Sequence, residues 1–134
     1  MTAVPVTLAA SAAAVFVNIW LGSRIAKLRH RFKVSVGDGG QEPLLRRMRA
    51  QANFIENAPF FLILVASLEL SGANRAGLGV IAAIFTLARI AHAIGMDGGS
   101  LAIWRRIGIL ISSIAIVLLA IWAILCVARS FSGG

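Results

Sequence analysis

The chain has 134 residues, of which 59% are apolar and only 13% are charged. Soluble domains carry about 25% charged residues, so this composition excludes an ordinary soluble domain and indicates an all-α integral membrane protein. The net charge of +8 is typical of basic loops beside anionic lipid, and no nucleic-acid partner is expected. The single cysteine and the two distant histidines exclude an internal disulfide and disfavour a metal site.

Four apolar segments, taken in chain order, are candidates for membrane-spanning helices. The first, residues 2–23, has no basic residue before its apolar run, so it fits a transmembrane helix better than a cleaved signal peptide. The middle segments, residues 58–68 and 76–88, reach the roughly 20 residues of a span only if their polar neighbours enter the helices. With a fourth span at residues 107–128, we expect one domain, residues 1–134, that forms a four-helix transmembrane bundle.

The basic residues are distributed unequally among the connections between these spans. Eight of the thirteen lie between residues 24 and 49, and Arg105 and Arg106 precede the fourth span, whereas only Arg75 and Arg129 belong to the opposite side. The positive-inside rule therefore predicts that the first and third connections face the cytoplasm and both termini lie outside, in a bacterial inner membrane. The short link at residues 69–77 predicts an antiparallel hairpin of the second and third helices.

This topology brings polar side chains from all four helices to the cytoplasmic end of the bundle. At 3.6 residues per turn, four polar positions of the second helix fall within a sector of about 100°, while Gln51 points elsewhere. Charged groups at this depth cost several kcal/mol unless they are paired or hydrated, so the cluster predicts an interior pocket. The first helix ends at this level with Arg24, Lys27 and Arg29, of which Arg29 is the candidate for the pocket. The other members are Arg49, Asn53, Glu56 and Asn57 on the second helix, Arg89 and His92 on the third, and Arg105 and Arg106 on the fourth.

Two interpretations of this cluster are compatible with the residue pattern. Glu56 and Arg89 alone would form a structural ion pair that locks the second helix to the third. However, Arg49, Arg105 and Arg29 converge on the same level and leave an excess of positive charge, which predicts an anionic ligand. Arginine forks bind carboxylates bidentately and Glu56 would take an ammonium, so the expected ligand has more carboxylates than amines.

The segment "RAQANFIENAP" (residues 49–59) resembles the Arg-x-Gln-x-Asn-x-x-Glu-x-x-Pro signature of a known family. This is the family of membrane-associated proteins in eicosanoid and glutathione metabolism, abbreviated MAPEG. The segment "ARIAHAIGM" (residues 88–96) and the basic pair before the fourth span support the resemblance, which covers the size and topology of the whole chain. It implies a homotrimer of four-helix subunits that binds glutathione between neighbouring subunits near the cytoplasmic face.

Carried over position by position, the resemblance implies a role for each candidate residue. Arg49, Asn53 and Glu56 would hold the glutathione backbone, with Glu56 on the amine. Arg105, or alternatively Arg106, would stabilise the thiolate and so be catalytic. The remaining residues of the implied binding set are Arg29, Asn57, Arg89 and His92. Glutathione, or alternatively another low-molecular-weight thiol, is the implied co-substrate, and no metal is implied.

The sequence has no tyrosine, and Asn57, His92 and Met96 stand where the eicosanoid enzymes have one. This difference disfavours a leukotriene synthase and favours a generic transferase or peroxidase that detoxifies lipophilic electrophiles or hydroperoxides from the bilayer. The alternative is a catalytically silent membrane binding protein of the same fold. A transporter or channel is disfavoured, because the cores of the first and fourth spans contain no charged residue.

Several other polar residues are expected to have no chemical role. We expect Asn18 to form an interhelical hydrogen bond and Cys126 to pack in the core. The remaining basic residues of the first connection are expected to serve topology and lipid headgroups; they are Lys27, Arg31, Lys33, Arg46 and Arg47.

Overall fold

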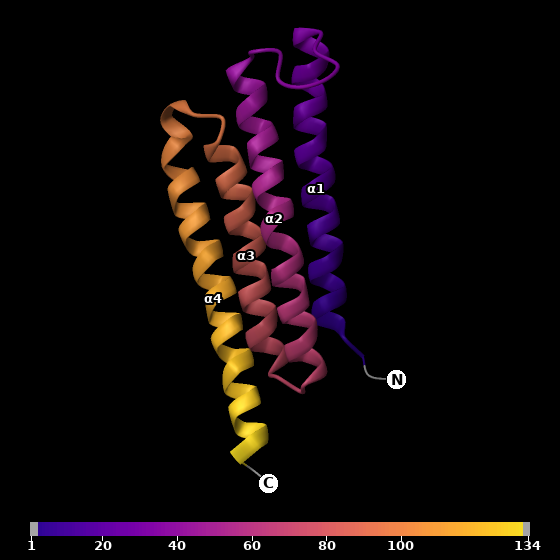
Figure 1. Ribbon diagram of the computed structural model, residues 1–134, viewed down its shortest axis with the longest axis vertical. Helices are drawn as coiled ribbons and strands as arrows, with labels where there is room; N and C mark the ends of the chain where they lie inside the picture. The colour runs from indigo at the N-terminus through magenta and orange to yellow at the C-terminus, as the bar shows by residue number, and fades with distance from the viewer. Residues whose placement is uncertain (1–2, 133–134) are drawn as a thin grey trace.

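A computed structural model describes residues 3–132, so residues 1, 2, 133 and 134 of the predicted domain lie outside the described part. Four long helices dominate it (Figure 1): α1 (Pro5–Phe32), α2 (Glu42–Leu70), α3 (Arg75–Gly95) and α4 (Ala102–Ser132), with a short 3₁₀ helix η1 (Gly99–Leu101) before α4. Each of the four is long and apolar enough to cross a membrane. The predicted all-α class and the four spans are confirmed.

The helices extend well beyond the apolar segments from which they were predicted. α1 continues to Phe32 instead of ending near residue 23, and α2 begins at Glu42, so the first connection shrinks to residues 33–41. Arginine and lysine are good helix formers, so their charge limits the apolar span without ending the helix. Lys33 ends α1 in the left-handed conformation, with φ 56°. All six arginines between residues 24 and 49 are therefore fixed on helices instead of in a loop.

The bundle has two chemically different ends (Figure 1). The end that holds both termini and the α2–α3 turn is called the hairpin end here. Its turn is formed by residues 71–74, as predicted, and the Asn74 side chain caps α3 by accepting a hydrogen bond from Gly77 N at 2.8 Å. The other end, where α1 and α3 finish and α2 and α4 begin, carries most of the arginines and is called the basic end.

At the hairpin end, Glu69 ties two helices together. It belongs to the predicted link of residues 69–77, but it lies inside α2 and is only 5% exposed. Its carboxylate accepts hydrogen bonds from Val6 N at 3.0 Å and from Thr7 N and Thr7 Oγ1 at 2.8 Å, and Arg75 Nε lies 3.6 Å away. Since Val4 offers α1 no capping side chain, Glu69 supplies the cap from the neighbouring helix.

The apolar core fills the middle of the bundle toward the hairpin end. The rings of Phe61 and Phe85 stack with centroids 3.9 Å apart, joining α2 to α3. Val65, Leu78 and Leu119 are completely buried around them. Cys126 is partly buried against the same cluster, so its predicted packing role is confirmed.

Two glycines set the start of α4 directly against α3 at the basic end. A Cβ atom at Gly95 would collide with the backbone of Trp104 and Arg105, and one at Gly108 would collide with the backbone of Ala88 and His92. Such close approach of two backbones is a common use of glycine in membrane helices. The contact fixes where the first turns of α4 lie, and therefore the backbone of Arg105.

Candidate functional site

A cavity of about 490 Å³ opens at the basic end between α2, α3 and α4. Its volume lies within the range of about 300–1,000 Å³ that small-molecule sites occupy. The lining residues are Arg49, Ala52, Asn53 and Glu56 of α2, His92 of α3, Met96 at the end of α3, and Arg105, Arg106 and Ile109 of α4. Six of the nine candidate residues from the sequence therefore border one hollow.

The α2 side of the cavity is a single helical face. Arg49, Asn53 and Glu56 follow one another at intervals of about one turn, which brings them to the same side of the helix. Arg49 and Glu56 are exposed, and neither forms a side-chain hydrogen bond or ion pair within residues 3–132. The alternative of a structural Glu56–Arg89 ion pair is therefore wrong, and the Glu56 carboxylate is unpaired within residues 3–132.

The α4 side contributes two guanidinium groups from its first turns. The Arg105 carbonyl oxygen lies 3.0 Å from His92 Nδ1. Because a carbonyl only accepts, Nδ1 must donate, and Nε2 of the neutral ring remains an acceptor. The backbone of Arg105 is thus held by His92 and Gly95, whereas the side chains of Arg105 and Arg106 are exposed and unpaired within the described residues.

Arg89 lies behind the cavity wall, and the expectation that it lines the site is corrected. It is 3% exposed and donates through Nη1 to Ser112 Oγ at 3.2 Å and through Nη2 to Asn53 Oδ1. Its Nε has no partner in the part of the chain that the structure describes. Helical periodicity placed Arg89 on the correct face, but the long side chain turns toward neutral groups of α2 and α4.

This placement of Arg89 has two consequences for the cavity. Because Asn53 Oδ1 accepts from Arg89, the Asn53 amide group is oriented with its N–H donors available to a ligand. The guanidinium charge also has no carboxylate partner among residues 3–132. A buried charge without a counter-ion costs several kcal/mol, and an anion in the adjacent cavity would offset part of that cost.

Two further candidates, Arg29 and Asn57, also lie outside the cavity of the single chain. Arg29 donates to Ser35 O at 3.2 Å and contacts Met48 Sδ at 3.6 Å, which directs it toward the first connection. Asn57 donates back to Asn53 O at 2.7 Å, one helical turn earlier, so its amide is used within α2. Their sequence positions were close to the site, but local hydrogen bonds turn both side chains away.

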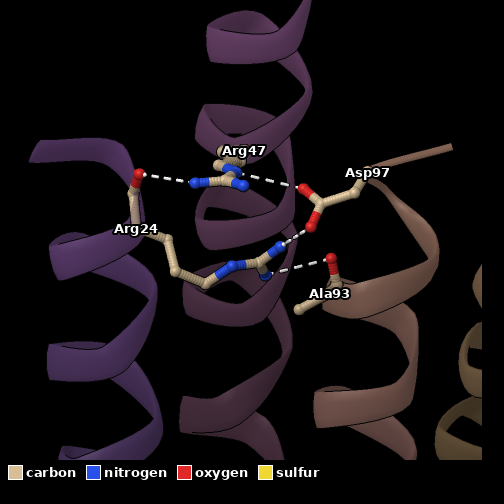
Figure 2. A network of polar contacts seen from close by, with 4 residues as sticks. All are labelled: Arg24, Arg47, Ala93 and Asp97. Atoms are coloured by element: carbon tan, nitrogen blue, oxygen red, sulfur yellow. Dashed lines mark hydrogen bonds and ion pairs between the residues drawn. The ribbon is translucent and has the colours of Figure 1, made fainter. Parts of the chain in front are cut away.

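A second polar network at the basic end involves residues outside the candidate set (Figure 2). Arg24 is 9% exposed, donates to Ala93 O at 3.0 Å and forms an ion pair with Asp97. Arg47 donates through Nε to Asp97 Oδ1 and through Nη1 to Arg24 O, both at 3.0 Å. The network joins α1, α2 and the end of α3. Arg47, which was assigned to lipid headgroups, is therefore a structural residue as well.

Gln51 and Asn18 form a separate contact between α1 and α2. Gln51 Nε2 donates to Asn18 Oδ1 at 3.1 Å. The predicted interhelical hydrogen bond of Asn18 is thus confirmed, and Gln51 points away from the cavity as expected.

Comparisons with known proteins agree with this architecture. The MAPEG family model matches residues 7–125. The chain is 27% identical over 97 residues to "Inner membrane protein YecN" of Escherichia coli strain K12, and equally to the protein of that name from Escherichia coli O6:H1 strain CFT073. Each match covers 72% of this chain and 73% of the relative. Together with the four spans, these similarities identify an integral membrane protein.

Proposed function

Because this chain belongs to the MAPEG family of eicosanoid and glutathione metabolism, we propose that the cavity at its basic end binds glutathione and activates its thiol. In this proposal the basic end faces the cytoplasm, since most of the arginine and lysine residues lie there. The observation that carries the proposal is the unpaired charge of the cavity. Three guanidinium groups and one carboxylate border it without any partner within residues 3–132.

The charges of the cavity complement those of glutathione, which has two carboxylates, one ammonium and one thiol. Arg49 and Arg106 would bind the carboxylates, because a guanidinium fork matches a carboxylate bidentately. Glu56 would accept from the ammonium, and the Asn53 amide would donate to a peptide carbonyl. The cavity has an excess of positive charge and glutathione an excess of negative charge. Each charged group of glutathione therefore has a partner of opposite charge in the cavity.

Arg105 is proposed to stabilise the thiolate. A free thiol has a pKa of about 8.5, so only a few per cent is ionised at neutral pH. A decrease of one to two pKa units requires about 1.4–2.7 kcal/mol, which one close guanidinium can supply in a site of low dielectric. The thiolate would form a carbon–sulfur bond to an electrophilic carbon of a lipophilic substrate, while a leaving group such as halide departs with the electron pair of its bond to that carbon. With a lipid hydroperoxide, the thiolate would attack the terminal peroxide oxygen, the O–O bond would break, and the lipid alkoxide would take a proton and leave as the alcohol. The glutathione sulfenic acid formed would then react with a second glutathione to give the disulfide and water.

The single chain provides only part of the enclosure around this ligand. Arg49, Glu56, Arg105 and Arg106 are all exposed in it, so the cavity opens on the side of the bundle. In the proposed homotrimer a neighbouring subunit would supply the missing wall. Arg29, which does not reach the cavity of its own chain, is proposed to bind a glutathione carboxylate across that subunit boundary.

The test is the ultraviolet absorbance of the thiolate in bound glutathione. We expect wild type to show the thiolate band and Arg105→Ala to lose it while still binding glutathione. Arg106→Ala, which lacks a proposed carboxylate contact, is compared at saturating glutathione and should keep the band. Equal thiolate absorbance in wild type and Arg105→Ala would remove Arg105 from this role.

The absence of tyrosine supports a second candidate function. With no phenol in the chain, thiolate stabilisation depends on arginine alone, and a catalytically silent glutathione-binding protein of the same fold is the alternative. Conjugation of glutathione to a reactive aryl halide in detergent, with binding measured in parallel, separates the two. Turnover selects the transferase, and binding without turnover selects the silent protein.

A further inference from the structure

A second cavity, of about 350 Å³, lies at the basic end near the α1–α2 connection. It shares no lining residue with the candidate glutathione site, so the two are distinct. The residues that line it are Leu28, Arg31 and Phe32 from the end of α1, Pro43 and Arg47 from the start of α2, and Asp97 after α3.

The polar side of this smaller cavity has an excess of positive charge. The Asp97 carboxylate is already paired with both Arg24 and Arg47 (Figure 2). Arg31 forms no hydrogen bond or ion pair within residues 3–132, and its guanidinium lies 5.9 Å from the centre of the Phe32 ring. Arg47 uses Nε and Nη1 in the network, which leaves Nη2 without a bond to the described residues. Two guanidinium groups therefore have donors available to an anion.

The other side of the cavity is apolar. Leu28 belongs to a buried cluster with Ile25 and Leu44, and Phe32 packs against that cluster. Pro43 completes the apolar wall. The cavity also lies where α1 changes from apolar to basic residues, and this change is typical of the level of the lipid headgroups.

We propose that this cavity binds an anionic phospholipid through its phosphate group. Arg31 and Arg47 would donate to the phosphate oxygens, because guanidinium groups bind phosphate with charge-assisted hydrogen bonds. The glycerol and the first carbons of the acyl chains would pack on Leu28, Phe32 and Pro43. Free phosphate shares the charge but makes no use of the apolar wall, so the structure points to the lipid. This site does not depend on the proposed glutathione chemistry.

The experiment measures lipid binding by native mass spectrometry of the full chain in detergent, with phosphatidylglycerol or phosphatidylcholine added. Arg31→Gln is compared with Lys27→Gln, since Lys27 has the same charge on the same helix but does not line the cavity. Wild type is expected to prefer phosphatidylglycerol. Arg31→Gln should lower that affinity by about fivefold, while Lys27→Gln should change it by less than about twofold.

Three results would overturn the proposal. Equal losses in Arg31→Gln and Lys27→Gln would show a diffuse surface charge instead of a site. Equal affinity of wild type for the two lipids would remove the requirement for an anion. Inorganic phosphate that displaces phosphatidylglycerol at comparable concentration would identify free phosphate as the ligand. Neither Arg31 nor Lys27 has a hydrogen-bond or ion-pair partner within residues 3–132. Both Arg31→Gln and Lys27→Gln are therefore expected to keep the wild-type melting temperature.

Discussion

Two of the three glutamates of α2, Glu56 and Glu69, have opposite surroundings. At the hairpin end, Glu69 is buried and accepts three hydrogen bonds from the first turn of α1. At the basic end, Glu56 borders a cavity and has no partner among residues 3–132. Charged groups within a membrane span are costly unless they are satisfied. The comparison indicates that Glu69 holds the fold together, whereas the Glu56 carboxylate is free to pair with the ammonium of glutathione, as we propose.

Arg24 and Arg89, which are buried at the basic end, also differ in whether their charge has a partner. Arg24 is paired with Asp97 and also donates to a backbone carbonyl (Figure 2). Arg89 is more deeply buried but contacts only the neutral side chains of Asn53 and Ser112. Arg24 is thus a structural residue with its own counter-ion. Arg89 lacks one within the described residues, and its charge favours an anion in the cavity beside it.

The largest expected effect follows from Arg105→Ala. Turnover with an aryl halide at neutral pH should fall by about 10–100-fold, because a rise of one to two units in the thiol pKa removes that much thiolate. The rate should recover as pH increases, since the thiol then ionises without help. Initial rates at saturating glutathione between neutral and alkaline pH measure this. Parallel pH profiles for wild type and Arg105→Ala would contradict it, and Arg106→Ala serves as the control.

Glu56→Gln is expected to weaken glutathione binding by about tenfold, the loss of about 1.4 kcal/mol. The substitution keeps the shape of the side chain but removes the charge that pairs with the ligand ammonium. Calorimetric titration with glutathione and with an analogue that lacks the amine separates this contact from others. If Glu56→Gln weakens both ligands equally, the proposed pairing is wrong.

Arg89→Met tests whether a buried charge serves the ligand instead of the fold. We expect glutathione affinity to fall by about threefold, while the free energy of unfolding changes by no more than about 1 kcal/mol, because an uncompensated buried charge is replaced by an apolar side chain. Arg24→Met is the matched comparison, and it should cost about 2 kcal/mol by leaving Asp97 with one partner fewer. Chemical denaturation in detergent gives both values. A larger loss of stability in Arg89→Met than in Arg24→Met would reverse the assignment.

The smallest expected effect on the site is that of Glu69→Gln. The amide retains one acceptor oxygen but loses the charge at the N-terminus of α1, so the melting temperature should fall by several degrees. Glutathione affinity should remain within about twofold of wild type, because Glu69 lies at the opposite end of the bundle. Thermal melts followed by circular dichroism, with binding measured separately, test both statements. Weaker binding with an unchanged melting temperature would be the contrary result.

The span pattern and the helical period predicted the architecture and the α2 face of the site. Arg49, Asn53 and Glu56 recur on one side of a helix, so their arrangement follows from local geometry. The same helical period predicted the face of α3 on which Arg89 lies. It did not predict how deeply the Arg89 side chain is buried. Its side chain turns behind Asn53 and donates hydrogen bonds to Asn53 of α2 and to Ser112 of the adjacent helix α4.

The pattern of apolar and polar residues did not predict the contacts between segments that are far apart in sequence. Glu69 and the first turn of α1 are separated by more than 60 residues, and no local signal pairs them. Asp97 lies in the turn after α3, and its ion pairs with Arg24 of α1 and Arg47 of α2 were not predicted. For Glu69, the available signal was a carboxylate beside the turn of an apolar helical hairpin. For Asp97, it was an acidic residue close to many arginines.

We propose that the unpaired positive charge of the cavity holds glutathione as a thiolate. A thiol that ionises on binding releases its proton, so the most direct test is to measure proton release when glutathione binds. Calorimetric titrations at neutral pH in two buffers of different ionisation enthalpy measure the protons released. We expect release of a substantial fraction of a proton per glutathione bound, and none with S-methyl glutathione. Binding of glutathione without proton release, or equal release with the S-methyl analogue, would contradict it.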